Sequence, residues 1–178
     1  MTINELIERD STFTESAFKA KVDNIYIMLL SSIISGDMNR VRHKLSDELY
    51  NKYDLIVSDL NNQGVTQLYD ELNVKDTIID SIEENNEEYL IHVTLISRYM
   101  PYRINKQTGT YICGIKDHRI EINNKLVFSK RKDAKEEGAS RTCTYCGAPI
   151  DANNNGICRY CNMPYNTKEF DWILKSMN

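Results

Sequence analysis

The spacing of apolar residues changes once along this chain, near Gly64, and that change limits the possible folds more than any other feature. Before Gly64, apolar residues recur every three or four positions, which is typical of helices that bury one face. After Gly64, they alternate with polar residues and include many β-branched side chains, which is typical of strands. Helices followed by a run of strands predict an α+β fold with an antiparallel sheet, since parallel strands need long crossover connections between them.

Two long helices are expected before Gly64. Thr12 and Glu15 have the spacing of a capping box at the start of the first helix, and Gly36 ends it. The apolar face of this helix consists of Phe18, Val22, Ile25, Tyr26, Leu29 and Ile33. A short helix is predicted over 38–45, and Ser46 is the expected N-cap of the next long helix. The apolar face of that helix is expected to be Leu49, Tyr53, Ile56 and Leu60.

Strands are predicted over 73–82, 89–99, 111–114 and 119–128. The hairpin turn at 83–88 contains Asn85 and Asn86, which tolerate the positive φ that tight hairpins need. The charged segment 130–141 is predicted to be a mobile loop or a hairpin tip. The apolar run 169–174 should return to the sheet as a closing strand, with Phe170 and Trp172 beside strand 89–99.

The composition narrows the function classes. The chain has 178 residues and a net charge of −4, which argues against a dedicated nucleic-acid binder. It contains no apolar run of about 18 residues, so no transmembrane helix is expected. Five cysteines and an acidic N-terminus without a secretory signal argue against a disulfide framework. We therefore expect a cytoplasmic protein, or one peripheral to a membrane surface.

The most specific motif is a pair of Cys-x-x-Cys sequences. Cys143 and Cys146 form the first pair, and Cys158 and Cys161 form the second after eleven intervening residues. Four thiolates in a tetrahedron are the ligand set that structural Zn²⁺ takes. Because a closed Cys₄ shell leaves no position for water or substrate, we predict one structural zinc ion and no catalytic role for it.

The residues after each pair support this prediction. Gly147 and Asn162 follow the second cysteine of each pair, and both residue types tolerate a positive φ. Iron could occupy the same tetrahedron and remains an alternative. A thioredoxin-like redox motif would use a single Cys-x-x-Cys, so it fits less well. Cys113, the fifth cysteine, lies in a strand-like run and is predicted to be buried and inert.

Aromatic and basic residues flank the cysteines: Arg141, Tyr145, Arg159 and Tyr160. Such residues stack on bases and contact phosphates in nucleic-acid-binding zinc ribbons. Because the chain is acidic overall, we prefer the interpretation that the tyrosines cover the metal core. The basic run 130–132 could contact anionic lipid, but it is predicted to be solvated. His92 has no obvious partner for catalysis.

Several motifs resemble bacterial Tim-forty-four-like (Tim44-like) domains. The segments 14–18 (TESAF) and 45–50 (LSDELY) resemble the motifs that open two helices in that family. A subgroup carries a C-terminal zinc ribbon, and CTYCGAP (143–149), GICRYC (156–161) and Asp171-Trp172 are similar to it. The resemblance covers the chain from about Phe13 onward. It departs from the subgroup at Thr144, where proline is usual, and in the charged segment before Cys143, where relatives have a tryptophan-containing strand.

The resemblance implies a nuclear-transport-factor-two-like or cystatin-like cone, in which helices pack on a curved antiparallel sheet with a cavity at the wide end. It gives an α+β domain over 12–130 plus 168–178, and a zinc ribbon over 141–165 inserted before the last strand. The namesake is a peripheral inner-membrane subunit of the mitochondrial import motor, which tethers a chaperone and contacts cardiolipin.

The leading hypothesis is a non-enzymatic binding or scaffold protein for a protein, peptide or lipid partner. It predicts a mainly apolar site between helix and sheet. One alternative is a cone-fold isomerase or dehydratase that uses His92 with a carboxylate or tyrosine on a neighbouring strand. The other is a zinc-ribbon nucleic-acid binder centred on Arg141 and Arg159. The sequence does not determine the oligomeric state.

Overall fold

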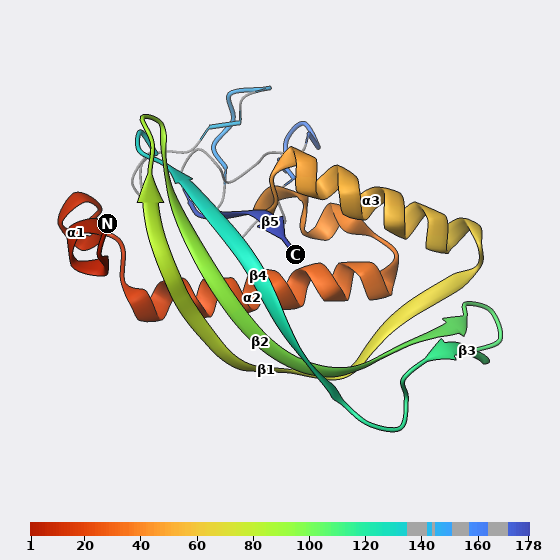
Figure 1. Cartoon of the computed structure of the whole chain (residues 1–178). Coiled ribbons are helices and arrows are strands. Elements are labelled where there is room, and N and C mark those ends of the chain that lie inside the picture. The colour runs from red at the N-terminus through yellow and green to blue at the C-terminus, as the bar shows by residue number, and fades with distance from the viewer. Residues whose placement is uncertain (135–141, 144, 151–156, 164–170) are drawn as a thin grey trace.

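The α+β fold expected from the sequence is confirmed. The computed structural model describes residues 1–134, 142, 143, 145–150, 157–163 and 171–178. Helices occupy the first third of the chain and strands follow them. Figure 1 shows the long strands of an open sheet curving around the two main helices. The cysteine segments come between β4 and β5 along the chain.

Helix α1 (Ile3–Arg9) was not predicted from the sequence, although the signal for it is present. Thr2 and Glu5 form a capping box, in which the Thr2 side chain accepts from the Glu5 N–H and the Glu5 carboxylate accepts from the Thr2 N–H. Leu6 is fully buried in the main core. The first ten residues therefore belong to the folded domain.

Helix α2 (Glu15–Ser35) begins two residues later than the sequence predicted. Thr14, not Thr12, is its N-cap, because the Thr14 hydroxyl accepts from the Ala17 N–H at 3.3 Å. The Thr12 hydroxyl instead bonds to Asp10. Gly36 ends the helix in the left-handed conformation, with φ 73°. All six residues of the predicted apolar face are buried.

The predicted short helix consists of two 3₁₀ turns, η1 (Met38–Arg40) and η2 (Arg42–Lys44). Helix α3 (Asp47–Asn62) starts at the predicted N-cap, where the Ser46 hydroxyl accepts from the Leu49 N–H at 3.2 Å. Its predicted apolar face was wrong at Ile56, which is 41% exposed. Val57 is buried in its place, so the face that contacts the core is rotated by about one residue from the predicted one.

The sheet has five antiparallel strands: β1 (Val65–Glu84), β2 (Glu88–Asn105), β3 (Tyr111–Gly114), β4 (Ile120–Arg131) and β5 (Ile173–Met177). The order across the sheet is β1-β2-β4-β5. Strand β3 pairs with the far end of β2, beyond the residues that pair with β4. The closing strand predicted over 169–174 is displaced to β5 and pairs with β4, so β4 separates it from β2. Residues 169 and 170 lie outside the described part of the chain.

Strand β1 is longer than predicted because irregularities hide its first half in the sequence. Its pairing with β2 shifts register between Asp70 and Asn73 and at two later places. Glu71 has a φ of 51°, which breaks the alternation of the strand. Such bulges bend a strand and increase its twist, which accounts for the curvature of the sheet.

The turn after β1 does not use the predicted backbone conformation. Neither Asn85 nor Asn86 takes a positive φ. Instead, the Asn85 side-chain oxygen accepts from the N–H groups of Glu87 and Glu88, both at 2.8 Å. The side chain therefore closes the turn in place of a left-handed residue.

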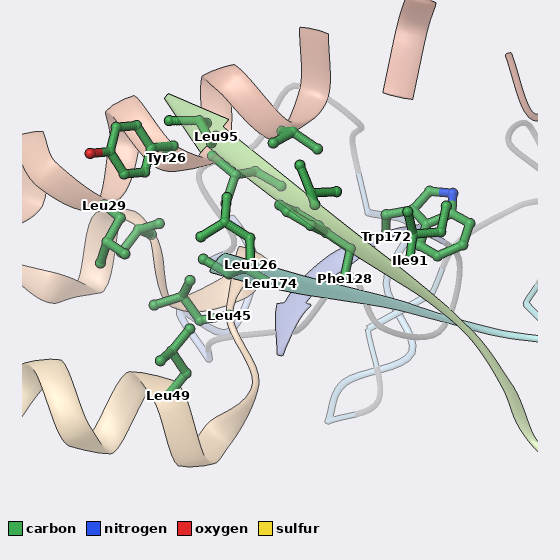
Figure 2. Close-up of a cluster of buried hydrophobic side chains, with 14 of the residues drawn as sticks. Tyr26, Leu29, Leu45, Leu49, Ile91, Leu95, Leu126, Phe128, Trp172 and Leu174 are labelled. Atoms are coloured by element: carbon green, nitrogen blue, oxygen red, sulfur yellow. The ribbon is translucent and has the colours of Figure 1, made fainter. Parts of the chain in front are cut away.

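The core lies between α2, α3 and the concave face of the sheet. In Figure 2, side chains from helices and strands meet in one cluster: Tyr26, Leu29, Leu45, Leu49, Leu95, Leu126 and Leu174. Alternate residues of β2 point into it, as its pattern predicted. Strand β5 is attached to the start of α3, because the Ser46 N–H donates to the Leu174 carbonyl at 2.9 Å and its hydroxyl donates to the Lys175 carbonyl at 3.0 Å.

Candidate metal centre

The structure brings the four predicted cysteines to one point, in the part of the chain that connects β4 to β5. The sulfurs of Cys143, Cys146, Cys158 and Cys161 all lie within 4.8 Å of one another. Cys143 and Cys161 are 3.6 Å apart at Sγ, and Cys146 and Cys158 are 3.7 Å apart. All four are free thiols, since a disulfide would need about 2.05 Å between its sulfurs.

The two Cys-x-x-Cys pairs repeat the same backbone geometry. In the first, the Cys143 N–H donates to the Ala148 carbonyl at 2.8 Å and the Gly147 N–H donates to the Cys143 carbonyl at 2.8 Å. In the second, the Cys158 N–H donates to the Met163 carbonyl at 2.9 Å and the Asn162 N–H donates to the Cys158 carbonyl at 2.8 Å. Two turns of identical geometry face each other across the sulfurs.

Each turn requires one residue in the left-handed conformation. Gly147 has φ 70° and Asn162 has φ 56°, as predicted from the residue types. The same turn leaves an N–H near a sulfur, and the Tyr145 N–H approaches Cys143 Sγ at 3.4 Å. Backbone donors of this kind stabilise thiolates, which are the metal-binding form of cysteine.

The sulfur geometry fits a tetrahedral metal site. A Zn–S distance of about 2.3 Å places the sulfurs of a tetrahedron about 3.8 Å apart. The two short sulfur–sulfur distances, 3.6 and 3.7 Å, are close to that value. The four cysteines could therefore hold one metal ion, and thiolate sulfur favours zinc or iron over magnesium or calcium.

The thiols have different proton affinities. N–H groups of Cys161 and Tyr160 lower the pKa of Cys158 to about 7. The Met163 N–H lowers the pKa of Cys161, but burial and the three neighbouring thiols outweigh it and raise that pKa to about 12. Four sulfurs this close disfavour full ionisation unless a cation compensates their charge.

A comparison with protein families identifies the family of the chain, and the matched residues end before the cysteine cluster. The Tim44-like domain family matches residues 1–139. The chain belongs to the Tim44-like domain family. The Tim44-like match includes the helices α1, α2 and α3 and the strands β1 to β4, and it ends before Cys143. Strand β5 lies beyond the matched residues but completes the same sheet.

Other comparisons add little to the Tim44-like assignment. No curated protein matches the chain. Among solved structures, the crystal structure of the intermembrane space region of chloroplast protein ARC6 matches with 8% sequence identity and a TM-score of 0.38. That match covers 64% of this chain and 83% of that chain. A TM-score this low carries no argument about function.

The surroundings of the cysteines differ from the sequence-based prediction. Tyr145 and Tyr160 are each 63% exposed, so they do not cover the metal core. Arg159 is also exposed, and Arg141 lies outside the described residues. Cys113 is exposed as well, so the prediction of a buried thiol was wrong. Strand β3 is short and lies at the end of the sheet, where all four of its residues are exposed.

The prediction of a solvated loop at 130–132 holds only in part, because Arg131 and Lys132 are exposed but Lys130 and Arg131 belong to β4. Lys130 and Arg131 are the last residues of β4, and each charge has a carboxylate partner. Lys130 Nζ lies 2.5 Å from Asp10 Oδ2, and both side chains are largely buried. Lys132 Nζ lies 2.7 Å from Glu84 Oε2, and Arg131 pairs with Asp133 at 2.6 Å. These ion pairs join three segments that are far apart in the sequence.

The acid–base pair that the enzyme hypothesis required is not formed. His92 lies on the outer face of β2, and Nε2 is 3.6 Å from a carboxylate oxygen of Glu83. The Glu83 side chain is 61% exposed, whereas the His92 Nε2 atom is buried and has no hydrogen-bond partner among the described residues. In the part of the chain that the structure describes, no helix is long and apolar enough to cross a bilayer.

The inner face of the sheet instead carries a neutral hydroxyl network. The Tyr26 hydroxyl is 2.8 Å from Ser97 Oγ, and Asn124 Nδ2 donates to Ser97 Oγ at 3.1 Å. Burial raises the pKa of Tyr69 to about 12 and also raises the pKa of Tyr99. These tyrosines stay protonated at neutral pH, so they are unsuited to act as general bases.

Proposed function

We propose that this chain is a non-catalytic binding or scaffold protein that binds a protein, peptide or lipid partner. The observation that carries the proposal is the match of residues 1–139 to the Tim44-like domain family. Buried apolar side chains fill the interface between the helices and the concave face of the sheet, together with the uncharged Tyr26, Ser97 and Asn124 side chains, and this interior supports a non-catalytic role. Membership of the Tim44-like domain family suggests a membrane-associated scaffold or binding role and supports this interpretation.

We also propose that the Cys cluster forms one structural Zn²⁺ site. Cys143, Cys146, Cys158 and Cys161 would supply four thiolates, and the metal would supply the bonds that hold the two turns together. The N–H groups around Cys143 and Cys158 position the sulfurs, and those around Cys158 favour its ionised form. Since four protein ligands fill a tetrahedral shell, the site would be a cross-link between segments and not a centre of reaction.

We divide the chain into an α+β domain over 12–130 plus 168–178 and a zinc ribbon over 141–165. Leu6 of α1 packs into the same core as the α+β domain, so residues 1–11 belong with it. We place the protein in the cytoplasm, peripheral to a membrane surface. The family assignment supports that location through the scaffold role, and the free thiols are consistent with a reducing compartment.

Quantitative affinity capture from cells at native expression, with co-purified lipids and proteins both identified, tests this function. A Cys146→Ser, Cys158→Ser variant removes the metal site and leaves the apolar core unchanged. A partner retained by the variant binds the Tim44-like domain, and one that is lost binds the cysteine module. If neither a protein nor a lipid is enriched reproducibly over an unrelated bait, the scaffold proposal is wrong.

A second candidate function rests on one specific observation. Tyr145 and Tyr160 occupy equivalent positions in the two turns and are equally exposed at 63%, with Arg159 exposed beside Tyr160. Exposed aromatic rings next to an arginine are suited to stacking on unpaired bases. Titration of a fluorescent single-stranded oligonucleotide tests it: a Tyr145→Ala, Tyr160→Ala variant should lose any affinity. Equal anisotropy for both proteins would exclude base stacking at this face.

A further inference from the structure

A polar pocket of about 240 Å³ lies beside the N-terminus of α2, apart from the Cys cluster. Three aromatic side chains that are almost completely buried line its inner wall: Phe13, Phe18 and Trp172, at 3–4% exposure. Trp172 contacts Phe18 at 5.2 Å and Phe13 at 6.1 Å between ring centroids. These packed rings form a rigid wall, and they place the only tryptophan of the chain at the pocket.

The rim of this pocket is strongly cationic, although the chain as a whole has a net charge of −4. Five basic side chains line it, and they come from the ends of α1 and β4 and from α2: Arg9, Lys21, Lys130, Arg131 and Lys132. Only two carboxylates, Asp10 and Asp171, are among the lining residues. Glu84 pairs with Arg9 and Lys132 from outside the lining, so with Arg131 set aside four cations face three carboxylates, an excess of one positive charge.

Ion pairs around the pocket hold its cations in position and neutralise part of their charge. Glu84 contacts both Arg9 and Lys132, so one carboxylate is shared by two cations, and Glu84 does not line the pocket. Burial raises the pKa of Asp10, but hydrogen bonds from Lys130 and Thr12 outweigh it and hold that pKa below its usual value. Asp10 and Glu84 therefore stay ionised at neutral pH, and they hold Arg9, Lys130 and Lys132 in position.

Neutral donors add to the attraction for an anion. The first turn of α2 lines the pocket through Thr14 and Ala17, and this helix is 21 residues long. The N-terminus of a long helix carries a partial positive charge and favours anions. The hydroxyl of Thr12, 3.3 Å from Lys130 Nζ, also lines the pocket.

We propose that this pocket binds the dianion of a soluble phosphate monoester. The excess of positive charge and the N-terminus of α2 favour an anion, such as a group with a charge of about −2 at neutral pH. Lysine and arginine donors together with hydroxyl groups match its three acceptor oxygens. The volume suits a small ligand, since pockets for drug-sized molecules start at about 300 Å³. The pocket is separate from the metal site, and its charge does not depend on the scaffold role proposed above.

Trp172 emission of the full, metal-loaded chain measures this binding directly. Inorganic phosphate and glycerol 3-phosphate are titrated at constant ionic strength, and both should change the emission with saturation. A Lys21→Gln, Lys132→Gln variant should bind at least tenfold more weakly. Since Lys21 pairs with Asp171, Lys132→Gln alone is a second variant that leaves that pair intact, and it should weaken binding several-fold.

The matched control is Lys19→Gln, Lys75→Gln, which removes the same charge outside the pocket and should bind as the parent protein does. Vesicles of phosphatidylcholine with and without phosphatidic acid form the lipid arm. A response to phosphatidic acid vesicles alone would overturn the soluble ligand in favour of a membrane headgroup. Absence of saturation by either soluble phosphate, or equal loss in the pocket and control variants, would overturn the site itself.

Discussion

The α+β domain and the cysteine module are held together by different physical causes. In the domain, buried apolar side chains from α2, α3 and four strands form one continuous cluster. Among the described residues between β4 and β5, Cys143 and Cys158 are buried, whereas Tyr145, Ile157, Tyr160 and Met163 are 39–63% exposed. The described residues of the module include too few buried apolar groups to form a core, so its order would depend on coordination.

Loss of the metal is the largest expected effect, and it should be confined to the module. Structural zinc contributes on the order of 10 kcal/mol to small modules. We expect one zinc per chain in purified protein, none in the Cys146→Ser, Cys158→Ser variant, and little change in the cooperative unfolding of the α+β domain. Metal analysis after dialysis measures the zinc content. Thermal unfolding, followed by circular dichroism, measures the cooperative unfolding of the α+β domain.

Cys113→Ser is the matched control, because it removes an exposed thiol outside the cluster and should retain full zinc content. Complete unfolding of the double variant would show that the module is part of the core. Finding iron instead of zinc would keep the site but change its metal.

The reciprocal experiment places a charge in the core of the α+β domain and leaves the metal site intact. Ile25 is 1% exposed at the centre of α2, so Ile25→Asp places an unpaired carboxylate among apolar side chains. We expect a loss of at least about 4 kcal/mol in unfolding free energy, which is enough to unfold the domain. Zinc binding should persist, because the four sulfurs are close together in sequence and need no contact with Ile25.

Ile56→Asp provides the control for that change. Ile56 is 41% exposed on α3, and the substitution should cost well under 1 kcal/mol, measured by urea denaturation. The sequence alone placed both residues on apolar faces, so the two variants would behave alike if that assignment were right. Loss of zinc together with the fold in Ile25→Asp would contradict the independence of the two regions.

The pH dependence of the domain should follow His43. Burial and, to a smaller extent, the positive charge of Lys44 together lower the pKa of His43 from 6.5 to about 4. The folded state therefore disfavours the protonated ring. The free energy of unfolding that the neutral His43 ring contributes is fully present above pH 6.5. It decreases as the pH falls toward 4, by about 3 kcal/mol at most.

Urea denaturation between pH 7 and pH 4 measures this loss. His43→Gln should flatten the dependence over that range, whereas His118→Gln should not, because the His118 side chain is 63% exposed. An unchanged slope in His43→Gln would assign the pH dependence to the carboxylates instead. The metal site should also weaken on acidification, since its thiolates must stay deprotonated.

The smallest expected effect concerns the start of α2. Thr14→Ala removes the hydroxyl that accepts from the Ala17 N–H and should cost about 1 kcal/mol. Thr14→Ser keeps the hydroxyl and should cost much less. Thermal unfolding resolves the difference, and equal losses in the two variants would contradict the cap at Thr14.

The sequence determined the elements whose signals are local. The change of period at Gly64 gave the order of helices and strands, and Ser46 and Gly36 gave helix ends, because caps depend on a few neighbouring residues. The cysteine cluster was also predictable, since two short motifs bring their ligands together by local turns with a left-handed residue at Gly147 and Asn162. The Thr2–Glu5 capping box carried equally good information about α1.

Tertiary structure decided everything that depends on distant partners. Which side of α3 faces the core follows from where β1 and β5 lie, so helical spacing could not distinguish Ile56 from Val57. The exposure of Cys113 follows from the position of β3 at the end of the sheet. The cationic pocket combines Arg9, Lys21 and Lys132. No pattern in the sequence joins them, because their proximity results from the curvature of the sheet around α2.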